Sequence, residues 1–209
     1  QHIKDQRFFM LTWAKVGWVK VFSKTQVFTP AELKQLKIGM PPDLPNMNNA
    51  FRGMGFSLVN MTLGETLIAL NSGKVNAIYN SPIYVASMQV FTIAKYMMSI
   101  NVAPVMGGIV MNQQREYQAL TRLAYWPQLL ASAQKIGLEI NASLGSLESA
   151  AMNTMLSYGL KLSTLTPEQE NLWYADMEKA MPDLLRGGVF DRQLYDQIIA
   201  ILQRYRRGR

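Results

Sequence analysis

The sequence contains no cysteine and a single histidine, His2, among its 209 residues. Without cysteine the chain has no disulfide, no thiol nucleophile and no cysteine-ligated zinc. A lone histidine near the start of the chain leaves Ser–His and Cys–His catalytic pairs without a base, and it offers no histidine metal site. These absences predict a protein that is not an enzyme and needs no cofactor or metal.

Glycine loops that bind nucleotides and long apolar runs are missing as well. Gly53-Met54-Gly55 and Gly107-Gly108 lack the spacing and the lysine that phosphate binding needs. The most apolar stretch, 102–111, is shorter than the roughly 18 residues of a membrane-spanning helix and is interrupted by proline and glycine. The sequence therefore indicates neither nucleotide chemistry nor a membrane span.

Charge is sparse, at 17% of residues, and hydrophobic residues make up 49%, which is typical of a folded protein of one large or two small domains. The net charge is +7, and part of the excess lies at the end of the chain, in Arg204, Arg206, Arg207 and Arg209. A basic end can contact nucleic acid or anionic lipid, but cations are also favoured at the end of a helix. No basic stripe interleaved with aromatic residues accompanies it, so no nucleic-acid partner is predicted.

Strand and helix patterns alternate in the first half of the chain. Residues 8–28 predict two strands with a bend at Gly17, and Thr29-Pro30-Ala31-Glu32 predicts a capped helix start. Short strands are expected at 38–40, 56–61, 75–79, 95–100 and 105–111, with helices at 46–54 and 64–70. This order is typical of an α/β sheet with helical crossovers.

From Gln113 onward the pattern is helical almost throughout, and Thr166 begins a second capping box. Two apolar stripes at helical spacing predict buried helix faces. The first is Leu172, Trp173, Ala175, Met177 and Ala180; the second is Leu194, Ile198, Ile201, Leu202 and Tyr205.

Two linked segments carry a resemblance to a known family. Residues 29–41, TPAELKQLKIGMP, are similar to the pattern "tpeDLkGlKiRvP", and residues 61–82, MTLGETLIALNSGKVNAIYNSP, to "mpfgElytALqtGvvDGqEnp". Lys95-Tyr96 then follows like the element "vqKYlt". In this order and spacing the chain resembles the periplasmic solute-binding proteins of TRAP transporters, the DctP-like family. Beyond Asn112 the likeness is one of pattern alone.

The resemblance implies a two-lobed α/β periplasmic binding protein, type II-like, with long C-terminal helices and an incomplete first lobe. Residues 1–17 and 106–145 are expected to be the remainder of lobe I with a connecting helix, and 18–105 and 146–209 to form lobe II. The implied location is periplasmic, with lipid anchoring through an absent N-terminal portion as one option; the chain begins at Gln1 without methionine, as a processed or truncated chain does. The implied partners are a small solute, membrane permease subunits and, in one branch of the family, a periplasmic TPR-repeat protein.

The resemblance also indicates the ligand-binding positions. The family arginine that clamps a ligand carboxylate falls on Gly39, and a second basic position falls on Val19. The family aromatic position is Leu63, and the polar position after the arginine strand is Pro42. Asn80 coincides with the asparagine that hydrogen-bonds the ligand, with an Asx turn as the alternative role.

Loss of both basic positions predicts the class of ligand. A carboxylate buried without a partner costs several kcal/mol, so the expected solute is small and either apolar or zwitterionic. An apolar pocket is expected to include Trp18, Met40, Tyr79 and Tyr84, with Trp13 and Met61 beside them. Ordinary core packing is the alternative for each, and Lys15 or Lys20 could restore a charge. The competing hypothesis is a scaffold or interaction subunit that kept the fold and lost solute binding.

Overall fold

The computed structural model describes residues 8–112, 125–188 and 190–208. These residues form two compact units. Unit 1 contains the described residues up to 20, together with those in 80–89 and 101–160; unit 2 contains 21–79, 90–100 and the described residues beyond 160. The chain therefore passes between the units several times. The lobe ranges expected from the sequence concern the complete receptor and stay a prediction.

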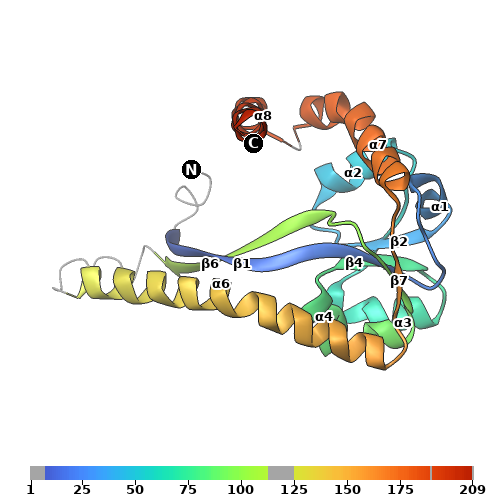
Figure 1. Cartoon of the computed structure of the whole chain (residues 1–209), viewed down its shortest axis with the longest axis horizontal. Helices are drawn as coiled ribbons and strands as arrows, with labels where there is room; N and C mark the ends of the chain where they lie inside the picture. Colours follow the sequence, from blue (N-terminus) through green and yellow to red (C-terminus); the bar gives the residue numbers. More distant parts are fainter. Residues whose placement is uncertain (1–7, 113–124, 189, 209) are drawn as a thin grey trace. The chain divides into compact units, whose positions relative to one another are not determined.

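Unit 2 is built on a sheet whose strands follow the order β3-β2-β4-β1-β5-β7. Figure 1 labels β1, β2, β4 and β7 among them. The strands are β1 Phe8–Ser23, β2 Lys37–Met40, β3 Ser57–Asn60, β4 Ala77–Asn80, β5 Tyr96–Met98 and β7 Lys161–Ser163. Only the last residues of β1, from Val21, belong to unit 2. β2 pairs in parallel with both β3 and β4, and β5 pairs in parallel with β7. Short helical crossovers join β2, β3 and β4, as the alternating pattern predicts.

Unit 2 has seven helical segments in the described residues, and several of them begin at a side-chain cap. They are α1 Pro30–Lys34, α2 Pro45–Gly53, η2 Leu63–Glu65, α3 Thr66–Asn71, η3 Val90–Thr92, α7 Pro167–Arg186 and α8 Arg192–Arg207. The predicted capping boxes of α1 and α7 are both present: Glu32 N donates to Thr29 Oγ1, and Gln169 N to Thr166 Oγ1, each at 3.3 Å. Both helix starts are confirmed.

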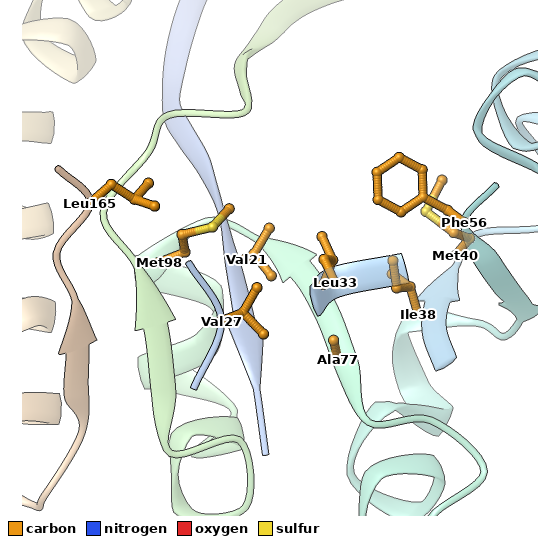
Figure 2. Packing of buried hydrophobic residues seen from close by; sticks show 9 residues of the cluster. All are labelled: Val21, Val27, Leu33, Ile38, Met40, Phe56, Ala77, Met98 and Leu165. Carbon is orange, nitrogen blue, oxygen red and sulfur yellow. The ribbon is translucent and has the colours of Figure 1, made fainter. Parts of the chain in front are cut away.

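The core of unit 2 lies between the sheet and these helices. Figure 2 shows its buried cluster of Val21, Val27, Leu33, Ile38, Met40, Phe56, Ala77, Met98 and Leu165. Met40 is 1% exposed and Ala77 is fully buried, so the ends of two central strands are part of this core. α7 is held to the sheet side by Trp173, whose Nε1 donates to the carbonyl of Phe28 at 2.9 Å. A Lys34–Asp176 ion pair at 2.8 Å links α1 to α7.

Unit 1 pairs the first part of β1 with β6, Ala103–Asn112, in antiparallel fashion, and adds α4 Pro82–Ser87 and the long α6 Trp126–Ser157. The expectation of two strands in residues 8–28 is wrong, because β1 is a single strand whose register shifts between Lys15 and Gly17. Gly17 has φ +127°, which a side chain disfavours, and so absorbs this irregularity within the strand. α6 approaches β1 closely at Gly137, where an added Cβ would lie 2.8 Å from Thr12 Oγ1.

The second half of the chain differs from its pattern in two ways. It contributes β7, which the sequence did not indicate and which pairs beside β5. The expected burial of the stripe on α8 is wrong: Leu194, Ile198, Ile201, Leu202 and Tyr205 are 42% to 60% exposed. On α7 the stripe is split, with Ala180 buried and Leu172 52% exposed. None of the helices in the described ranges is long and apolar enough to cross a membrane.

Candidate ligand-binding site

Three parallel strands of unit 2 end at one edge of the sheet. In the register of β2 and β3, Met40 lies opposite Asn60, and β4 runs alongside β2. Ligands of α/β sheets bind beyond the carboxyl ends of such strands. Five of the predicted site residues belong to this part of unit 2: Gly39, Met40, Pro42, Leu63 and Tyr79.

Gly39, the position implied for the ligand-binding arginine, is buried and closely covered. A Cβ added to Gly39 would lie 2.5 Å from the Sδ of Met61, and 3.2 Å from its Cγ and Cε. Met61 is itself 7% exposed, and its backbone N donates to the Met40 carbonyl at 2.9 Å, which continues the pairing beyond β3. The thioether therefore occupies the space into which an arginine at position 39 would have to extend.

The loop after β2 is anchored by a residue that the sequence reasoning missed. Asn48, 2% exposed on α2, donates from Nδ2 to the carbonyl of Pro41 at 2.8 Å. Within the described residues its Oδ1 is buried without a hydrogen-bond partner. An asparagine inside a helix is unremarkable in sequence, so no signal pointed to it. Pro42, which follows the anchored carbonyl, is exposed.

Tyr79 supplies a neutral phenol near the end of β4. Burial, and to a smaller extent the negative charge of Asp43, raises the pKa of Tyr79 to about 12. Both causes disfavour the phenolate, so the hydroxyl keeps its proton at physiological pH. Leu63, the position of the family aromatic residue, is 54% exposed.

A cation that the motifs did not indicate lies near the end of β3. Arg52 on α2 donates from Nη2 to Asn60 Oδ1 at 3.3 Å and from Nη1 to Asn49 Oδ1 at 3.5 Å. The contact of Arg52 with Asn49 follows from helical spacing within α2. The contact of Arg52 with Asn60 depends on how α2 packs on β3, which the sequence does not show. Arg52 is exposed, in contrast to the covered Gly39.

The other four predicted residues, Trp18, Val19, Asn80 and Tyr84, belong to unit 1. Val19 is 7% exposed and packs in the interior. Trp18 is half-buried; its backbone N donates to Glu148 Oε1 at 3.4 Å, and Lys15 Nζ lies 5.7 Å from the centre of its ring. The second basic position is therefore an interior valine.

Lys20 is the half-buried cation of this part of unit 1. Burial lowers the pKa of Lys20, and the carboxylate of Glu148 opposes that change. A lysine that follows Val19 directly thus already has an acidic partner within its own unit.

Asn80 uses its side-chain oxygen in the adjoining turn. Its Oδ1 accepts from the backbone N of Ser81 at 2.8 Å, and Ser81 Oγ in turn accepts from Tyr84 N at 3.3 Å and caps α4. Tyr84 is half-buried on that helix. An Asx turn would need the backbone N–H two residues on, and Pro82 has none, so the Asx turn considered for Asn80 is not formed. Ligand contact by Asn80 and Tyr84 stays a prediction. Among the residues that the structure describes, no group of three or more histidine or acidic side chains could hold a metal ion.

Residues 1–186 match the family described as Bacterial extracellular solute-binding protein, family 7. The chain belongs to this family. Its members are solute-binding proteins of transporters and not enzymes, in agreement with the prediction from the missing catalytic groups. Helix α8 lies beyond the matched residues. No curated protein sequence matches the chain significantly.

Solved structures of TRAP periplasmic solute-binding proteins share the fold. One from Pseudomonas aeruginosa with bound L-malate is 17% identical, with a TM-score of 0.72, over 87% of this chain and 66% of that chain. One from Roseobacter denitrificans with bound β-D-glucuronate is 18% identical, with a TM-score of 0.77, over 93% and 63%. The ectoine-binding protein of a Halomonas elongata TRAP transporter is 13% identical, with a TM-score of 0.76, over 88% and 60%.

These likenesses confirm the predicted fold of the family 7 chain. The chain spans about 60% to 66% of the length of these three structures, in agreement with the expected incomplete two-lobed protein. At identities of 13% to 18%, these structures establish the architecture of the chain. The class of ligand has to be inferred from the chain's own residues.

Proposed function

We propose that this chain is the greater part of a periplasmic receptor of a TRAP-type transporter, which captures a small apolar or zwitterionic solute and delivers it to membrane permease subunits. The observation that carries the ligand class is the packing of Met61 against Gly39. At this position the resemblance implies an arginine, and the chain has instead a buried glycine covered by a thioether.

The ligand class follows from the energy of burying a charge. A carboxylate taken out of water needs a cation with good geometry, or its desolvation costs several kcal/mol. Gly39 and Val19 provide no such group, and both are buried. A solute without net charge avoids this cost, and the neutral phenol of Tyr79 can donate to its polar atoms.

A thermal-shift panel on the intact receptor tests the ligand class. We expect malate and glucuronate to leave the melting temperature unchanged, and a zwitterion such as ectoine or an apolar metabolite to raise it. At 100 times its Kd a ligand contributes about 2.7 kcal/mol. At about 2–4 °C per kcal/mol, the range for domains of roughly 150–250 residues, the expected rise is roughly 5–10 °C. Native mass spectrometry of the gently purified receptor identifies a retained solute directly.

Arg52 gives the panel a specific control, since it is the cation near the edge formed by β2 and β3. The Arg52→Gln variant should bind the native solute as the parent does. A carboxylate ligand whose binding disappears in Arg52→Gln contradicts the proposed ligand class, because a cation outside the family position then does the clamping. Absence of any ligand across the panel favours the scaffold hypothesis over solute binding.

A further inference from the structure

Helix α8 has two chemically different faces. At 100° per residue, five apolar side chains gather on one side, and we call them the α8 stripe: Leu194, Ile198, Ile201, Leu202 and Tyr205. Arginines and glutamines occupy the opposite side. A broad apolar face on a helix of otherwise polar composition is the pattern of helices that lie at an interface between water and an apolar phase.

The α8 stripe is exposed along its whole length. Tyr195 and Ile199, on the neighbouring flank, are half-buried, whereas every member of the stripe is at least 42% exposed. α8 also lies beyond residue 186, where the match to family 7 ends. The stripe is therefore an addition to the part of the chain that defines the family.

The charge of α8 complements an anionic surface. The helix carries four arginines and one aspartate, and Asp196 pairs with Arg192 at 3.0 Å. The other three arginines, all exposed, occupy the last turn. By helical spacing Arg204 and Arg206 fall on opposite sides of the stripe, where long side chains can reach headgroups while the stripe enters the apolar layer.

We propose that α8 docks on an anionic phospholipid bilayer, lying in its surface with the stripe at the boundary between headgroups and acyl chains. The helix has 16 residues, about 24 Å, so it is too short and too polar to span the bilayer. A second copy of the chain fits less well. Such a pairing brings together two helices of the same net charge.

Vesicle co-sedimentation of the intact chain tests this docking. We expect binding to vesicles of phosphatidylcholine and phosphatidylglycerol in equal parts, weaker binding to phosphatidylcholine alone, and a decrease as salt is raised. Ile201→Gln should weaken binding roughly tenfold or more, the equivalent of one buried aliphatic side chain. The double variant Arg204→Gln and Arg206→Gln should weaken it by about fivefold for each arginine.

A composition-matched variant separates the effect of the stripe's arrangement on binding from the effect of the helix's overall hydrophobicity. Gln203 lies on the polar side of α8, so the exchange of Ile201→Gln with Gln203→Ile keeps composition and charge and breaks the stripe. This exchange should bind as weakly as Ile201→Gln, and Gln203→Ile alone should bind as the parent does. Circular dichroism and thermal melting confirm that the variants are folded.

Three outcomes would overturn the docking. The first is no vesicle binding by the parent chain, and the second is equal binding by the exchange variant and the parent. The third is self-association in analytical ultracentrifugation that Ile201→Gln abolishes, together with no binding to vesicles. That result would mean that a second copy of the chain covers the stripe.

Discussion

Replacing Gly39 by alanine should destabilise unit 2, although the same change in an unobstructed strand stabilises a protein. Alanine lowers the conformational entropy of the unfolded chain relative to glycine, which contributes about 0.4–1 kcal/mol in favour of folding. In the folded state its Cβ would lie 2.5 Å from Met61 Sδ, closer than real Cβ contacts come. Met61 is flexible but only 7% exposed, so its thioether has little room to move aside. Overpacking of this kind costs about 1–3 kcal/mol, so the net change should range from about 0 to a loss of about 2.6 kcal/mol.

A double-mutant cycle isolates the contact. Met61→Ala alone removes a side chain that is 7% exposed and should cost about 2–5 kcal/mol. In that background the obstruction is gone, so Gly39→Ala should stabilise the protein by about 0.4–1 kcal/mol. The change of sign corresponds to a coupling of about 1–3 kcal/mol between the two positions, within the range measured for residues in contact.

Urea unfolding of the four proteins, followed by circular dichroism and by tryptophan fluorescence, measures the free energies. Coincident transitions by the two probes, with unchanged slopes, allow a two-state treatment. Additive effects of the two substitutions, with a coupling below about 0.5 kcal/mol, would show that Met61 does not limit which side chain position 39 can hold.

Three further predictions concern the same part of unit 2. The double variant Gly39→Arg with Met61→Ala should fold and bind malate measurably in calorimetry. Gly39→Arg alone should be strongly destabilised, because Met61 occupies the space that the aliphatic part of the arginine side chain needs. Asn48→Ala should lower the free energy of unfolding in urea by about 0.5–1.5 kcal/mol, since the carbonyl of Pro41 loses a hydrogen bond while the unsatisfied Oδ1 is removed as well. The pKa of Tyr79 is raised from 10.0 to about 12, so the stability it contributes is present below pH 10 and is lost between pH 10 and 12. Denaturant midpoints of Tyr79→Phe should decline less over that interval than those of the parent.

Local signals made much of the fold predictable. Thr29 with Glu32, and Thr166 with Gln169, satisfy backbone donors of their own helices, so these helix starts depend on no distant residue. The parallel strands β2, β3 and β4 were indicated by short apolar runs between such helices. β7 has three residues and is defined by pairing with β5, far away in sequence, so its own residues carry little signal.

The sequence predicted less well which helix faces are buried. Periodicity shows that a helix has an apolar face, but not which surface covers that face. Ala180 on α7 is buried and Ile201 on α8 is 57% exposed, although both occur in stripes of the same spacing. The difference arises from the packing of α7 against α1 and α2, and α8 makes no comparable contact within the described residues.

The relation between Gly39 and Met61 shows why a motif alone underdetermines a binding site. The sequence identifies the missing arginine, since the surrounding pattern is otherwise similar to that of the family. It does not identify Met61 as the residue in its place, because that contact depends on the register of β2 and β3, in which Met40 lies opposite Asn60. Met61 follows directly, and its N–H continues the pairing to Met40. The side chain of an arginine restored at position 39 would therefore clash with Met61, and a change of ligand class requires substitution at both positions.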